Sequence, residues 1–63
     1  MNQIKKARLA AGLTQGELAK KLSISVVSVC KWENGHTFPR PKRLKQVAKV
    51  LHIPVKDLLE EVS

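Results

Sequence analysis

Two helix-start signals follow each other so closely in this 63-residue chain that they restrict the fold more than any other feature. Thr14 and Glu17 form a T-x-x-E capping box, in which each side chain binds the backbone N–H of the other residue. Ser25 is the next N-cap residue, and the apolar residue just before it, Ile24, is expected to tuck under the turn. Two helices with so short a link cannot lie in line, so they must cross sharply, as in a helix-turn-helix.

The rest of the chain also has helical periodicity, and it predicts one all-α domain over residues 1–63. The expected helices are 2–11, 15–22, 26–34, 41–51 and 55–61. The residues expected to face the core are Ile4, Ala7, Ala11, Leu18, Ala19, Leu22, Val29, Trp32, Leu44, Val47, Ala48, Leu51, Leu58 and Leu59.

The charge distribution favours a polyanionic partner. The chain has 12 Lys and Arg against 5 Asp and Glu, and its pI is about 10.1. All the bases lie in residues 1–56, whereas residues 57–63 hold three acids and no base. A basic body of this kind suits nucleic acid, although a membrane surface or simple solubility remain alternative explanations. No apolar run approaches the roughly 20 residues that span a bilayer, and no secretory signal is visible.

The segment that Ser25 starts has two different faces when wound at 100° per residue. Val29 and Trp32 fall on the core side. The opposite side consists of Val26, Val27, Cys30, Lys31 and Asn34. A helix with short outward side chains, braced by a preceding capped helix, has the geometry that enters the major groove of DNA.

The segment LTQGELAKKLSISVVSVCKWENG resembles the helix-turn-helix of the lambda-repressor/Cro-like family, also called the xenobiotic-response-element type. The likeness continues through FPRPKRLKQVAKVLHIPVKDLL and covers residues 4–59. It implies a compact five-helix fold and a bacterial or phage transcriptional regulator. The implied mode of action is a repressor that binds double-stranded DNA in the major groove, as a homodimer on an inverted-repeat operator. The implied location is cytoplasmic and nucleoid-associated, in keeping with a lone unpaired cysteine.

The resemblance also implies roles for individual residues. Base contacts are expected from Val26, Val27, Ser28 and Lys31, and phosphate contacts from Gln15, Asn34, His36, Thr37 and Arg40. The family's glutamine at the position of Gln15 can also brace a reading side chain. Arg8 and Glu33 match a pair that forms a buried salt bridge in some relatives. Dimer contacts are expected from the last helix, at Leu58, Leu59 and Val62.

The chain departs from the family where Val26 and Val27 replace polar reading residues. They are expected to contact thymine methyl groups, or else to pack on a loop or a partner protein. Cys30 is expected to be inert, with a redox or metal switch as the alternative. Its spacing to His36 and His52 matches no zinc pattern, and no catalytic set, cofactor or small-molecule site is evident. An antitoxin, or an interaction module that has lost DNA binding, are the alternative functions.

Overall fold

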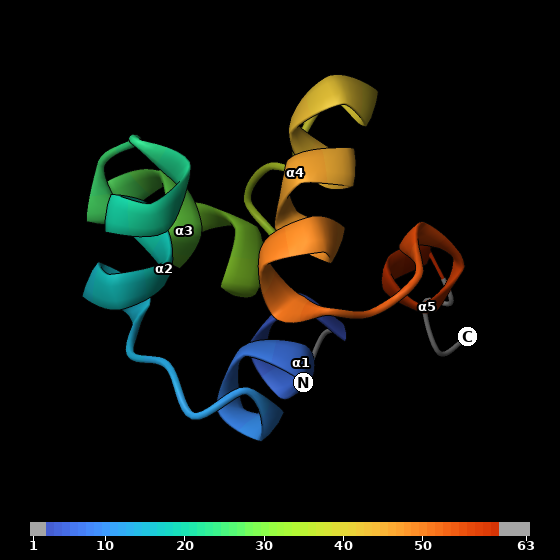
Figure 1. The fold of residues 1–63 in the computed structure, drawn as a ribbon. Coiled ribbons are helices and arrows are strands. Elements are labelled where there is room, and N and C mark those ends of the chain that lie inside the picture. The colour runs from blue at the N-terminus through green and yellow to red at the C-terminus, as the bar shows by residue number, and fades with distance from the viewer. Residues whose placement is uncertain (1–2, 60–63) are drawn as a thin grey trace.

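The computed structural model describes residues 3–59, and this part of the chain contains five α-helices and no strand (Figure 1). The helices are α1 (Gln3–Ala10), α2 (Gln15–Leu22), α3 (Val26–Glu33), α4 (Pro41–Leu51) and α5 (Val55–Leu59). The predicted all-α fold is therefore confirmed. The bounds of α1 to α4 agree with the sequence to within one residue at each end, whereas the predicted end of the last helix lies outside the described residues.

Local capping explains where α2 and α3 begin and end. The Glu17 N–H donates to Thr14 Oγ1 at 3.0 Å, and the Thr14 N–H donates to Glu17 Oε1 at 2.8 Å, so the capping box is complete. Ser23 ends α2 in the left-handed conformation, with φ of 58°. Ser25 is extended, and its hydroxyl caps the Ser28 N–H at 3.4 Å. This short turn makes α2 and α3 cross.

Helix α4 supplies the centre of the core. Pro41 occupies its first turn, and Leu44, Val47, Ala48 and Leu51 are buried. In Figure 1, α4 stands between the α2–α3 pair and α5, with α1 near its C-terminal end. The buried apolar residues form one cluster, and they are Ile4, Leu18, Ala19, Leu22, Val29, Trp32, Leu44, Val47, Ala48, Leu51 and Leu58.

Two residues expected in the core lie on the surface instead. Ala11 is exposed because α1 already ends at Ala10, and the chain then turns through Gly12 at φ of 75°. Leu59 is 56% exposed, while its neighbour Leu58 is fully buried. Consecutive residues of a helix point about 100° apart, so a narrow α5 face holds only one of the two leucines.

Candidate nucleic-acid interface

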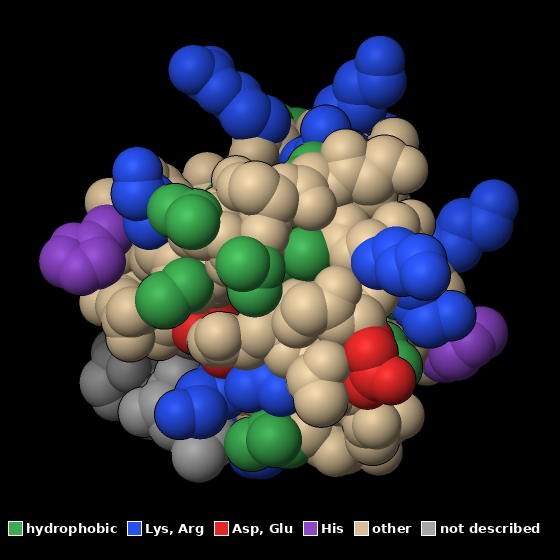
Figure 2. All heavy atoms as spheres, turned by 90° about the vertical axis from the view of Figure 1, so that its left-hand side faces the viewer, with side chains coloured by type: hydrophobic (Ala, Val, Ile, Leu, Met, Phe, Trp, Pro, Cys, Tyr) green, Lys and Arg blue, Asp and Glu red, His purple; other side chains and the backbone are tan. Residues whose placement is uncertain are grey.

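Helix α3 presents an apolar outward face. Val26 and Val27 are 46% and 56% exposed, and Lys31 is also exposed. Val29 and Trp32 are buried on the opposite side, as the helical period predicts. Figure 2 shows the side of the molecule formed by α2 and α3, where hydrophobic side chains gather in the middle and lysine and arginine side chains lie around them. An apolar centre with a basic surround is therefore available to a polyanionic partner.

Ser28 and Cys30 contribute less to this face than the valines do, because both are half-buried. The Ser28 hydroxyl lies 3.4 Å from the Ser25 hydroxyl, so it shares the cap of its own helix. The Cys30 Sγ accepts a hydrogen bond of 3.3 Å from Asn34 Nδ2. Asn34 is thus held along α3, with its amide nitrogen turned towards the thiol.

The loop after α3 folds back onto the last turn of that helix. Gly35 has φ of 79°, which favours glycine, and its N–H donates to the Trp32 carbonyl at 3.2 Å. The N–H groups of His36 and Thr37 both donate to the Lys31 carbonyl, at 2.9 and 3.4 Å. Both side chains are exposed, so the fixed backbone holds them beside the C-terminal end of α3.

A buried ion pair links α1 to the end of α3. Arg8 donates from Nε to Glu33 Oε2 at 2.6 Å and from Nη2 to Glu33 Oε1 at 3.1 Å. The two side chains are only 8% and 2% exposed. Arg8 Nη1 also donates to the Leu13 carbonyl at 2.7 Å, which fixes the segment leading into α2. These contacts explain why a charged residue lies on the inner edge of α1.

Glu33 also receives a hydrogen bond from Gln15, whose Nε2 lies 3.0 Å from Glu33 Oε1. The resemblance implied that Gln15 braces a reading side chain, but the residue it contacts is Glu33, at the opposite end of α3 from the valines. Burial alone would raise the pKa of Glu33. The hydrogen bonds from Arg8 and Gln15 and the positive charges of Arg8 and Lys5 outweigh burial, and the pKa is lowered.

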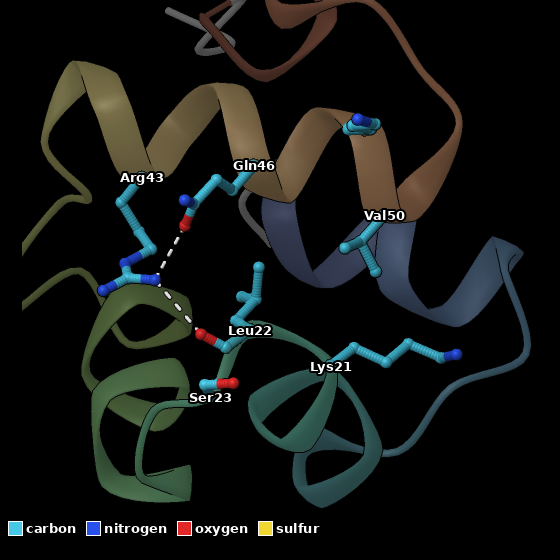
Figure 3. A pocket seen from close by; sticks show the side chains of 7 residues that line it. Lys21, Leu22, Ser23, Arg43, Gln46 and Val50 are labelled. Atoms are coloured by element: carbon cyan, nitrogen blue, oxygen red, sulfur yellow. Dashed lines mark hydrogen bonds between the residues drawn. The ribbon is translucent and has the colours of Figure 1, made fainter.

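Arg43 lies in a hollow between α2 and α4 and serves mainly to join them (Figure 3). Its Nη1 donates to the Leu22 carbonyl at 3.1 Å and to Gln46 Oε1 at 2.7 Å. A guanidinium on the last carbonyls of a helix satisfies them and complements the helix dipole. Arg40, at the start of α4, is exposed and makes no side-chain capping bond, so it is available to a phosphate.

An apolar hollow lies next to the expected dimer contact. Its lining consists of Phe38, Pro39, Pro41, Leu44, Lys45, Val55 and Leu59. Phe38 and Leu59 are exposed at this site, whereas Leu58 is fully buried and unavailable to a partner. Val62 lies outside the described residues. No role was predicted for Phe38, although an aromatic residue next to a proline of the linker was the available sequence signal.

Two helices that cross through a short capped turn, with the second helix exposing a half-apolar face, define a DNA-binding helix-turn-helix domain. The profile of the Helix-turn-helix family matches residues 4–58, which is most of the chain. The chain belongs to this family, in its lambda-repressor/Cro-like or xenobiotic-response-element branch.

A curated relative is the HTH-type transcriptional activator BcrR of Enterococcus faecalis, with 32% identity over 57 residues. The match covers 90% of this chain but 28% of that protein, so the chain spans less than a third of the relative's length. No solved structure matches the chain significantly. Within residues 3–59, no helix is long and apolar enough to cross a membrane, and no cluster of His, Cys, Asp and Glu could hold a metal ion.

Proposed function

We propose that the chain is a transcriptional regulator that binds specific double-stranded DNA sequences through α3. The observation that carries this proposal is the exposure of Val26 and Val27 on the second helix of the helix-turn-helix, on a side of the molecule that is rich in lysine and arginine side chains (Figure 2). The basic surface supplies affinity for any DNA sequence, and the α3 face supplies the choice of sequence. Such a protein works on the chromosome, in the cytoplasm.

We assign to Val26 and Val27 the apolar contacts with thymine methyl groups. Apolar side chains recognise that methyl group in the major groove, and short ones let the helix approach closely. Lys31 lies one turn further along α3 and is exposed, which suits a hydrogen bond to a guanine edge. Ser28 is half-buried and shares the helix cap, so its contact would be the weakest of the four.

The phosphate contacts are assigned to residues at the two ends of the helix pair. Gln15 is the first residue of α2, where the backbone N–H groups and the helix dipole also favour phosphate. Asn34, His36 and Thr37 surround the C-terminal end of α3, and Arg40 follows in the same loop. These contacts would fix the register of α3 in the groove without reading sequence.

The proposed assembly is a homodimer on an inverted repeat. The apolar hollow and the exposed Phe38 and Leu59 form a surface that a second copy can cover. One helix-turn-helix of this size covers a small DNA surface, so two copies would raise specific affinity. Repression by occupying the operator is the proposed outcome.

Selection from random double-stranded DNA, followed by affinity measurement at two salt concentrations, tests this proposal. The expected result is an enriched motif and a steep loss of affinity with salt. Failure to bind DNA even at low salt would leave the α3 face as a docking site for protein. Expression of a reporter gene from the bound promoter then distinguishes repression from activation. Activation is the activity in the name of the relative.

A further inference from the structure

Glu33 fixes the orientation of the Gln15 side-chain amide. The amide nitrogen, Nε2, donates to Glu33 Oε1 at 3.0 Å. An ionised carboxylate has only acceptors, so Gln15 must turn its nitrogen and not its oxygen towards Glu33. The Gln15 carbonyl oxygen then points away from Glu33, and the second Nε2 hydrogen remains available as a donor.

Glu33 is itself rigidly held. Two hydrogen bonds from Arg8 occupy its two oxygens, and Arg8 is anchored in turn to the Leu13 carbonyl. The side chains of the pair are almost completely buried. A continuous set of contacts therefore runs from α1, through the last residue of α3, to the first residue of α2.

We propose that Glu33 is a positioning residue for DNA binding, which holds the Gln15 amide ready to donate to a backbone phosphate. This inference rests on the proposed function. A glutamine side chain that is already ordered loses less rotamer freedom when it binds a phosphate. The affinity of the protein for DNA is therefore higher. Glu33 acts through Gln15 and does not touch the DNA itself.

The ion pair also removes an electrostatic obstacle. A carboxylate 3.0 Å from a phosphate-binding amide would repel the phosphate if it were unpaired. Arg8 neutralises this charge, and Lys5 lies close enough to act on the same carboxylate. The charge of Glu33 is therefore compensated where the Gln15 amide meets it.

A double-mutant cycle on DNA affinity tests the inference, with Gln15→Ala measured in the wild type and in Glu33→Gln. In the wild type we expect the Gln15→Ala change to weaken binding by about tenfold, the worth of one hydrogen bond to a charged group. In Glu33→Gln the same change should cost less than about twofold, because glutamine at position 33 offers a donor as well as an acceptor and no longer fixes which way the Gln15 amide points. Within each background the Gln15→Ala change should leave the salt slope unchanged, since Gln15 carries no charge.

Equal costs of Gln15→Ala in both backgrounds would show that Glu33 is merely structural, and would overturn the inference while leaving the proposed function intact. Absence of DNA binding by the wild type would overturn both. If Glu33→Gln does not fold, NMR relaxation of the wild type decides: the order parameter of the Gln15 Nε2 group should approach the rigid value of about 0.85. A value below about 0.6 would overturn the inference.

Discussion

At the scale of single residues, the buried pair of Arg8 and Glu33 has a large expected effect on stability. Their side chains are 8% and 2% exposed and share two hydrogen bonds. Replacing the pair with apolar residues of similar volume often changes stability little, but removing one partner strands a buried charge. The pair therefore acts mainly by fixing how α1 packs against the end of α3.

Glu33→Ala should lower the free energy of unfolding by about 3 kcal/mol, because Arg8 would stay buried without its counter-ion. Urea denaturation followed by circular dichroism measures this change. Glu17→Ala is a useful comparison, since it removes an exposed acid and one capping bond only. A loss below about half a kcal/mol for Glu33→Ala would contradict the burial of the pair.

The lowered pKa of Glu33 predicts how stability depends on pH. A carboxyl group whose pKa is lower in the folded state stabilises the protein above its unfolded pKa, near 4.5, and this contribution is lost as pH falls through the folded pKa. The stability difference between the wild type and Glu33→Gln should thus be constant from neutral pH down to about 5 and shrink in more acidic solution. Thermal melts of both proteins across this range measure it, and a difference that stays constant down to pH 3 would contradict it.

At the scale of the helices, local signals predicted most of the fold. Thr14, Glu17, Ser25 and Pro41 fix helix starts through contacts within a few residues, so the sequence reveals them directly. The left-handed Ser23 that ends α2 has no comparable signal in its side chain.

Contacts between helices could not be predicted in the same way. The role of Arg43 depends on where the end of α2 lies against α4, and Gln15 meets Glu33 only after α2 and α3 cross. From the sequence Arg43 was expected to meet phosphate, like Lys42 beside it, and its bond to the Leu22 carbonyl was not foreseen. Leu59 was misplaced because periodicity over a helix as short as α5 does not separate two adjacent leucines.

The start of α4 combines a poor cap with a candidate phosphate contact. Arg40 occupies the N-cap position but makes no capping bond with its side chain. Arg40→Ser should raise the free energy of unfolding by about 0.5–1 kcal/mol, because serine can cap the free N–H groups. The same change should weaken DNA binding and reduce the salt slope by about 1, as one phosphate contact is lost.

Chemical denaturation and salt-dependent DNA titration measure the two effects of Arg40→Ser separately. Lys49→Ser is the control on the same helix, since Lys49 is exposed, is not among the expected phosphate contacts and does not line the apolar hollow. An unchanged salt slope in Arg40→Ser would remove Arg40 from the DNA contacts.

At the scale of the whole molecule, the apolar hollow beside α5 predicts self-association. Leu59→Asp should weaken the dimer without unfolding the monomer, since Leu59 is 56% exposed and adds little to the core. Sedimentation equilibrium should show the wild type as a dimer and the variant as a monomer at the same concentration. A wild-type monomer at high micromolar concentration, both free and on DNA, would contradict the proposed assembly.

The Val26–Val27 face of α3 is the surface proposed to read DNA sequence. Leu9→Ala is the matched control, because Leu9 is a 51% exposed apolar residue on another helix, α1. The most direct measurement is selection of bound sequences from random DNA with the wild type, Val26→Ala, Val27→Ala and Leu9→Ala. We predict that the wild-type motif contains positions with a preference for thymine, and that this preference is lost in Val26→Ala and Val27→Ala but kept in Leu9→Ala. The salt slope should be the same in all four proteins. An identical motif in all four proteins would contradict the claim.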